Sequence, residues 1–145
     1  MQGWRRDVWL ERLRTQRYGP GGHYNHHFDW TGNSAGWGRV SSFMVWVDAD
    51  EELVGGGTEF PMLEARSGND ICGLVECDEG GSDAEATEMG DGMKGTVFKV
   101  KPGNAVYWEN FGADGRGFDE TYHAALPVEK GTKVGLNIWT FGRIE

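Results

Sequence analysis

The sequence predicts an all-β domain, and three observations lead to that prediction. Short segments rich in β-branched and aromatic residues recur along the chain, turns rich in glycine and proline separate them, and helical periodicity is almost absent. With 145 residues the chain is long enough for one core, so we expect a single domain over residues 1–145. Short strands of this kind are typical of a sandwich or a barrel.

The strand signals follow one another along the chain. Residues 40–47 (VSSFMVWV) predict a buried strand, and residues 96–100 (TVFKV) predict an alternating one. Pro102 and Gly103 predict a turn before a further strand at residues 105–108. Residues 133–141 (KVGLNIWTF) alternate again. One face of that strand would carry Lys133, Gly135, Asn137, Trp139 and Phe141, and the other Val134, Leu136, Ile138 and Thr140.

Two segments depart from this pattern. A minor amphipathic helix fits residues 7–13, although Trp9, Leu10 and Leu13 are too few to decide it, and residues 64–94 predict a long acidic surface loop with a net charge of -7. The only cysteines, Cys72 and Cys77, fall in that loop and would form a local disulfide or remain free thiols. A zinc site is not expected, because the chain has no second cysteine pair and the loop has no histidine.

Charge and hydropathy exclude several kinds of partner. The net charge is -9 and only the first 18 residues are basic, so we expect no nucleic-acid partner, which would need a basic face. No apolar run approaches the ~20 residues that span a bilayer. We also expect no signal peptide, since no apolar stretch follows the basic residues at the N-terminus.

Residues 18–30 (YGPGGHYNHHFDW) contain the pattern with most chemical content. In an extended strand, residues two apart point to the same face, so His27 and Asp29 would project together while His26 and Phe28 point away. An isolated His-x-Asp pair is weak evidence, because it is common by chance. His27 alone would more often be an ordinary surface or core histidine, and the same holds for His123 alone.

Each of these residues belongs to one of four motifs that follow one another along the chain: Arg17-Tyr18-x-Pro20-Gly21-x-x-Tyr24-x-x-His27-Phe28-Asp29, Gly55-Gly56-Gly57-Thr58-Glu59-Phe60-Pro61, residues 101–108 (KPGNAVYW), and His123-Ala124-Ala125-x-Pro127-Val128 leading to Lys133. In this order and spacing the chain resembles a known family, the catalytic domain of the prolyl 4-hydroxylases within the 2-oxoglutarate- and Fe(II)-dependent dioxygenases. The collagen-type branch, in particular its fungal members, is the better match, because Thr132 stands where the oxygen-sensing branch usually has an arginine.

The resemblance implies a double-stranded β-helix (jelly roll) and a role for each of six residues. It makes His27, Asp29 and His123 the iron ligands and Lys133 the cation for the distal carboxylate of 2-oxoglutarate. Tyr18 and Trp139 would line the same cosubstrate pocket. Two histidines and one carboxylate hold Fe(II) on one face and leave open positions for the keto acid and O2. Few residues precede Tyr18, so the supporting elements that the family has there would be largely missing.

The expected function is therefore hydroxylation of a peptidyl proline, with Fe(II), 2-oxoglutarate, O2 and ascorbate, coupled to decarboxylation of 2-oxoglutarate to succinate and CO2. One alternative keeps this chemistry and changes the acceptor to a free amino acid or another small molecule. Another is a catalytically silent metal-binding β-sandwich or truncated remnant. The sequence leaves the target peptide, the oligomeric state and the compartment open, although relatives usually work in the endoplasmic reticulum.

Overall fold

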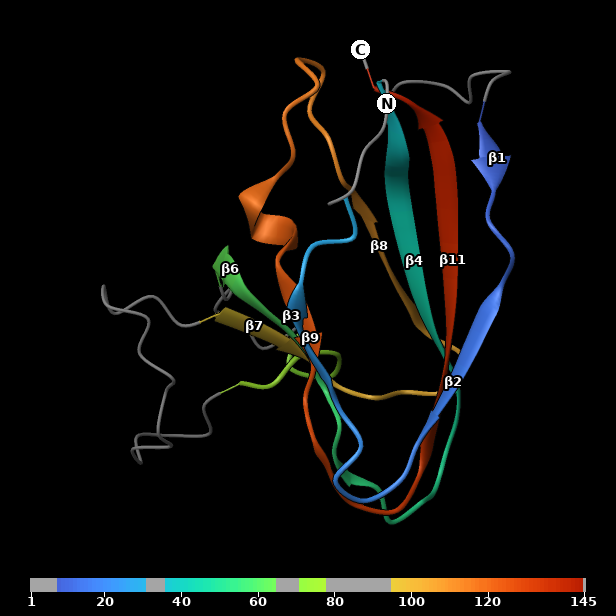
Figure 1. Ribbon diagram of the computed structural model, residues 1–145. Helices are drawn as coiled ribbons and strands as arrows, with labels where there is room; N and C mark the ends of the chain where they lie inside the picture. Colours follow the sequence, from blue (N-terminus) through green and yellow to red (C-terminus); the bar gives the residue numbers. More distant parts are fainter. Residues whose placement is uncertain (1–7, 31–35, 65–70, 78–94, 145) are drawn as a thin grey trace.

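Two antiparallel β-sheets face each other in the computed structural model, which describes residues 8–30, 36–64, 71–77 and 95–144 (Figure 1). The first sheet has the order β1-β11-β4-β8, and β2 also pairs with β11. The second has the order β3-β9-β6-β7. In the first sheet the strands are β1 (Trp9–Leu10), β2 (Arg14–Tyr18), β4 (Trp37–Ala49), β8 (Ala105–Glu109) and β11 (Lys133–Arg143). In the second they are β3 (Tyr24–His27), β6 (Thr58–Glu64), β7 (Gly95–Phe98) and β9 (His123–Ala125).

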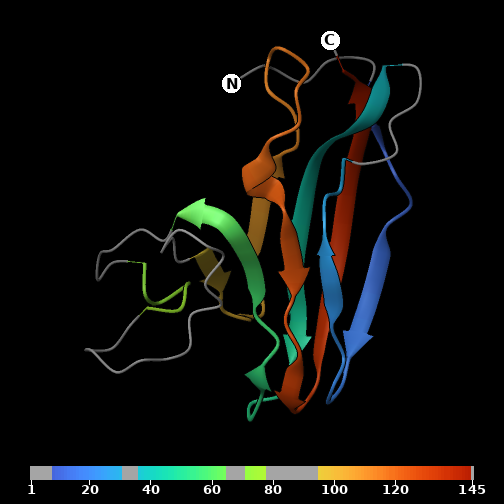
Figure 2. The same cartoon turned by 60° about the vertical axis from the view of Figure 1, so that its left-hand side comes forward.

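This arrangement confirms the predicted jelly-roll core. All the strand pairs between described residues are antiparallel, and a short ribbon of β5 (Val54–Gly55) and β10 (Val128–Lys130) lies beside the two main sheets. Figure 2 shows the two sheets from a second side, with β3 and β9 in front of β4 and β11. Chain segments that are far apart in sequence therefore contribute to one space between the sheets.

The four predicted strands are present as β4, β7, β8 and β11. The predicted alternation in β11 also holds over its first half, since Lys133, Gly135, Asn137 and Trp139 all line the space between the sheets. Register shifts after Val134 and after Thr140 bend the strand as it pairs with β4.

The predicted helix over residues 7–13 is wrong. Of the described part of this segment, Trp9 and Leu10 form β1 and pair with Phe141 and Thr140 of β11. A short apolar cluster fits either structure, and pairing with a long neighbouring strand overrides the weak helical pattern. The helix that the described residues do contain is the 3-10 turn η1 (Asp119–Thr121), just before β9. Among those residues, no helix has the length and apolar character needed to cross a membrane.

Most of the predicted acidic loop, residues 65–70 and 78–94, lies outside the described residues, and Glu64 belongs to β6. Residues 71–77 are described, and they pack against the sheet. Val75 is buried and bridges to Phe98 at the end of β7. Cys72 and Cys77 form a disulfide, which answers the question that the sequence left open.

The interior between the sheets contains unusually polar side chains for a core. Apolar residues such as Trp46, Phe60 and Val128 are buried, at 3%, 3% and 1% exposure. Asp29 and Lys133 are nearly as buried, at 6% and 4%. Acidic and basic side chains are rarely buried to this degree unless they are paired or functional, so their position indicates a site.

Candidate functional site

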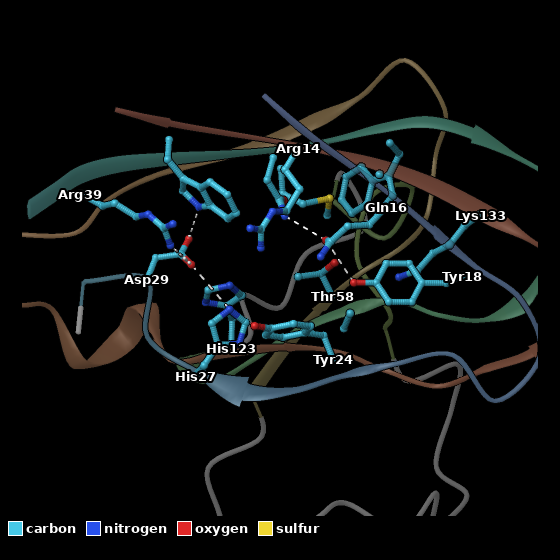
Figure 3. Close-up of a pocket in the computed structure, with 16 residues that line it drawn as sticks. Arg14, Gln16, Tyr18, Tyr24, His27, Asp29, Arg39, Thr58, His123 and Lys133 are labelled. Carbon is cyan, nitrogen blue, oxygen red and sulfur yellow. Dashed lines mark hydrogen bonds and ion pairs between the residues drawn. The ribbon is translucent and has the colours of Figure 1, made fainter. Parts of the chain in front are cut away.

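A pocket between the two sheets collects the residues that the sequence singled out. Figure 3 shows the 16 residues that line it, drawn from both sheets, with His27, Asp29 and His123 together at one end and Tyr18 with Lys133 at the other. The second sheet supplies the two histidines, and the first sheet supplies Tyr18, Lys133 and Trp139. All six sequence-predicted site residues therefore line one cavity.

The three predicted metal ligands converge. His27 and His123 are direct cross-strand partners on β3 and β9, and their ring centroids lie 4.3 Å apart. One ligand atom from each of His27, Asp29 and His123 lies within 4.8 Å of the other two. A spacing of this kind suits three ligands of one ion.

Asp29 reaches this cluster in a different way from the one predicted. Strand β3 ends at His27, so Asp29 lies in the turn after the strand rather than two residues along it. Side chains of the opposite sheet hold the carboxylate instead. Ser42 Oγ donates to Asp29 Oδ2 at 2.6 Å, and Trp139 Nε1 donates to the same oxygen at 2.9 Å. These bonds leave Oδ1 facing the histidines.

Both histidines are oriented by the same contact. His27 Nδ1 lies 2.8 Å from the carbonyl of Asn25, and His123 Nδ1 lies 2.8 Å from the carbonyl of Thr121. A carbonyl oxygen only accepts, so each Nδ1 carries the proton and donates it. In the neutral ring, Nε2 then has its lone pair free for a metal, which is the arrangement that oriented metal-binding histidines show.

The electrostatics keep the ligands in the forms that bind a metal. Burial acts to raise the pKa of Asp29, but the neighbouring rings of His27 and His123, which favour the carboxylate when they are protonated, and the hydrogen bonds from Ser42 and Trp139 outweigh it and lower that pKa to about 2. Burial also lowers the pKa of His123, which favours the neutral imidazole. The cluster at neutral pH therefore includes a carboxylate and a neutral ring.

A cation fits between these groups on geometric grounds. His27 Nε2 lies 3.5 Å from Asp29 Oδ1. When the ring is neutral both atoms are acceptors, so the contact requires a proton or a metal ion between them. Two imidazoles and one carboxylate with open space on the other side form the donor set of non-haem Fe(II) oxygenases, and Fe(II) fits these residues.

Lys133 at the other end of the pocket has the features of an anion-binding group. It is 4% exposed, and burial lowers its pKa to about 8. Its Nζ donates to the carbonyl of Gly56 and lies 5.1 Å from the centre of the Tyr18 ring. No carboxylate in the described part of the chain pairs with it. A buried ammonium without a counter-ion favours an anionic ligand.

The glycine run at residues 55–57 allows this contact with Lys133. Gly56 has a φ of +74°, and a Cβ there would come within 3.0 Å of Val128 Cγ2 and 3.3 Å of Lys133 Cδ. A larger residue would therefore be strained and would push the lysine aside. The motif Gly55-Gly56-Gly57 thus has a local physical role next to the anion-binding end.

Tyr18 and Trp139 both line the pocket. Burial raises the pKa of Tyr18, so its hydroxyl remains a donor, and it now donates to Gln16 Oε1 at 3.1 Å. Trp139 links the two ends of the site, because its indole borders the pocket and its N–H holds Asp29.

The other two histidines stay out of the cluster. His26 points away from it, as predicted, pairing with Glu59 at 2.7 Å and stacking on Tyr122. His23 Nδ1 contacts the carbonyl of Gly21. Phe28 also contacts Tyr122, so His26 and Phe28 share the face predicted for them.

Sequence reasoning missed the residues that support the site. Ser42 is fully buried and accepts a hydrogen bond from Asn110 Nδ2 at 3.2 Å. Its hydroxyl is therefore oriented to donate to Asp29 Oδ2. Arg39 forms a bidentate pair with Glu11, stacks 3.9 Å from the Trp139 ring, and lies 3.8 Å from Asp29 Oδ1. A serine among apolar residues at an inward position of a strand was the one signal for Ser42. Nothing local in the sequence points to the Arg39–Glu11 pair.

The comparisons with known proteins agree with this geometry. The model of the 2OG-Fe(II) oxygenase superfamily matches residues 13–141. The subunit alpha-1 of prolyl 4-hydroxylase from Bos taurus is 28% identical over 146 residues, which cover 92% of this chain and 20% of the relative. The transmembrane prolyl 4-hydroxylase of Homo sapiens is 29% identical over 150 residues, covering 89% of this chain and 29% of the relative.

Solved structures show the same fold. A viral collagen prolyl hydroxylase from Paramecium Bursaria Chlorella virus-1, in complex with 2OG, matches with a TM-score of 0.65 and 26% identity, over 93% of this chain and 60% of that one. A prolyl-4-hydroxylase from Pseudomonas putida matches with a TM-score of 0.50 and 15% identity, over 92% of this chain and 52% of that one, and shows the fold alone. The chain thus spans about a fifth of the bovine relative's length and three fifths of the viral one.

Proposed function

Because the chain belongs to the 2OG-Fe(II) oxygenase superfamily, we propose that it is a 2-oxoglutarate- and Fe(II)-dependent dioxygenase that hydroxylates a peptidyl proline at C4. The observation that carries the proposal is the convergence of His27, Asp29 and His123 at one end of a pocket whose other end holds the buried Lys133. Relatives named as prolyl 4-hydroxylases support the choice of substrate.

The proposed metal ligands and the proposed cosubstrate-binding residues lie at opposite ends of the pocket. His27, Asp29 and His123 would hold Fe(II) on one face, and Ser42 and Trp139 keep the carboxylate turned toward it. Lys133 would pair with the distal carboxylate of 2-oxoglutarate, assisted by the Tyr18 hydroxyl. When bound, Fe(II) and 2-oxoglutarate supply the electrons that activate O2, and the keto acid is converted to succinate and CO2.

A proline side chain suits the surface beside the metal end. Tyr24 lines the pocket, is 46% exposed, and packs edge-on against His27 with ring centroids 4.5 Å apart. An exposed aromatic ring next to the ligands offers an apolar platform for a pyrrolidine ring and positions it close to the metal.

The disulfide bears on the compartment. Cys72 and Cys77 are linked, and such bonds persist mainly in oxidising compartments. We therefore place the protein in the secretory pathway, with the endoplasmic reticulum as the site of action, where ascorbate would maintain the reduced iron.

Succinate release tests the function. The chain is supplied with Fe(II), 2-oxoglutarate and ascorbate under air, together with proline-containing peptides or with free proline. We expect succinate and hydroxyproline in a 1:1 ratio with a peptide, no product with free proline, and loss of both products in His27→Ala and Asp29→Ala. The matched control His26→Ala should keep its activity, because His26 lies outside the cluster.

Two outcomes would contradict this account. Turnover with free proline but not with peptides would assign the same chemistry to a small-molecule acceptor. Absence of succinate under every condition would mean a catalytically silent metal-binding domain.

A further inference from the structure

Arg14 is a cation in the pocket that has no anionic partner among the described residues. Arg14, Arg39 and Lys133 all line the cavity. Arg39 is neutralised by two hydrogen bonds to Glu11, at 2.6 and 3.0 Å. Arg14 forms no ion pair or hydrogen bond through its side chain with any residue in the described ranges. Its charge is therefore available to a ligand.

The strand geometry directs Arg14 into the cavity. It begins β2 and is the cross-strand partner of Asn137 on β11, so Arg14, Gln16 and Tyr18 share the inward face and Thr15 and Arg17 the outward one. Figure 3 shows its guanidinium pointing into the middle of the pocket, between the metal end and Tyr18.

Arg14 contacts a residue that supports the metal end. Its Cζ is 5.6 Å from the ring centroid of Trp139, the residue whose indole N–H donates to Asp29. Lys133 instead contacts Gly56 and the Tyr18 ring. The two unpaired cations therefore serve different parts of the cavity.

A keto diacid in this pocket would bring the anionic groups that its cations lack among the described residues. A keto diacid has two carboxylates, and Lys133 can pair with only the distal one. The C1 carboxylate next to the keto group would lie at the metal end, within the reach of a flexible arginine whose planar fork matches a carboxylate.

We propose that Arg14 pairs with the C1 carboxylate of the keto acid and so recognises its 2-oxo-acid end, while Lys133 recognises the distal end. The proposal rests on the proposed function, because it assumes that a 2-oxo acid binds at this metal site. It makes Arg14 a binding residue that the family-level motifs do not include.

Direct binding of two keto acids tests the assignment without turnover. 2-Oxopentanoate keeps the C1 carboxylate and keto group of 2-oxoglutarate but has a methyl group in place of the distal carboxylate. Dissociation constants for both are measured by calorimetry on the Mn(II)-loaded protein, for wild type, Arg14→Gln, Arg14→Lys and Lys133→Met. Arg17→Gln is the matched control, because it removes the same charge from the outward face of the same strand.

Loss of Arg14 should weaken both keto acids about equally, by roughly tenfold, since one charge-assisted contact common to both is removed. Arg14→Lys should restore part of the affinity. Lys133→Met should weaken 2-oxoglutarate and leave 2-oxopentanoate nearly unchanged, and Arg17→Gln should bind both ligands as the wild type does.

Three results would overturn the assignment. Unchanged binding of both keto acids to Arg14→Gln would remove Arg14 from the cosubstrate site, and a raised KM for the peptide would then assign it to the substrate. A loss limited to 2-oxoglutarate would place Arg14 at the distal carboxylate. Failure of the wild type to bind either keto acid would refute the proposed function itself, which is a different result from the first two.

Discussion

Lys133 and Asp29 are buried ionisable residues that respond differently to their surroundings. Four hydrogen-bonding or charged neighbours compensate the burial of Asp29, and its pKa falls to about 2. Lys133 contacts the Gly56 carbonyl and the Tyr18 ring and has no carboxylate partner among the described residues, and burial lowers its pKa to about 8. A cation is therefore favoured beside Asp29 and an anion beside Lys133. In the ligand-free protein the charge of Asp29 is compensated by its neighbours, whereas the buried charge of Lys133 destabilises the fold.

This asymmetry predicts a specific dependence of stability on pH. The pKa of Lys133 is lower in the folded protein, about 8, than its ordinary value of 10.5, so between these pH values the unfolded chain binds more protons. The free energy of unfolding should therefore rise from pH 8 to 10.5, by about 3 kcal/mol for this group alone. Below pH 8 the penalty is fully present.

The variant Lys133→Met isolates this contribution. Denaturant unfolding at pH 7.5 should show the variant to be more stable than the ligand-free wild type, with the difference shrinking toward pH 10.5. Saturating 2-oxoglutarate with Mn(II) should also remove the difference, because the bound carboxylate compensates the charge. A variant less stable than wild type at every pH would mean that the ammonium is not desolvated as the structure indicates.

Among the single elements, strand β4 both lines the pocket and supports the metal ligand Asp29. Its inward residues Ser42, Met44 and Trp46 alternate along the strand, with Ser42 at the metal end. The hydroxyl donates to Asp29 Oδ2 at 2.6 Å and accepts from Asn110 Nδ2. The hydrogen bond from this one inward serine therefore fixes the Asp29 carboxylate relative to β4.

Replacing this serine gives a prediction with an internal control. Ser42→Ala should weaken Fe(II) or Mn(II) binding by roughly 10- to 100-fold, as loss of a residue behind a metal ligand does. Ser41→Ala, one residue away on the opposite face, removes a buried hydroxyl that bonds to Thr140 Oγ1 and should leave metal affinity unchanged. Competition against a chelator measures both variants, and equal losses in the two would show that the effect is one of folding.

The elements also show where sequence reasoning succeeded. β4, β7, β8 and β11 were predictable because alternation and β-branched residues reflect burial on a pleated strand. β1 was not, because two residues pair with a distant strand and have no pattern of their own. Asp29 was predicted to join His27 because residues two apart in a strand share a face. In the structure β3 ends at His27, and hydrogen bonds from Ser42 and Trp139 of the opposite sheet hold Asp29 in place instead.

At the scale of the whole molecule, the site exists only because two sheets meet. His27 and His123 come from the β3–β9 pair, while Tyr18, Ser42, Lys133 and Trp139 come from the other sheet. Spacing along the chain cannot show such convergence, and only the resemblance of four separated motifs suggested it. The supporting Arg39–Glu11 pair and the free cation Arg14 depend on register between strands, for which the sequence contains no separate signal.

In the loaded protein we expect one metal ion and one keto diacid to bridge these two sheets. Anomalous diffraction at the iron edge, on crystals grown without oxygen in the presence of Fe(II) and 2-oxoglutarate, would locate both groups. We expect one strong iron peak bonded to His27 Nε2, His123 Nε2 and Asp29 Oδ1, with the keto acid extending from the iron to Lys133 Nζ. An iron peak elsewhere, or a distal carboxylate turned away from Lys133, would contradict this expectation.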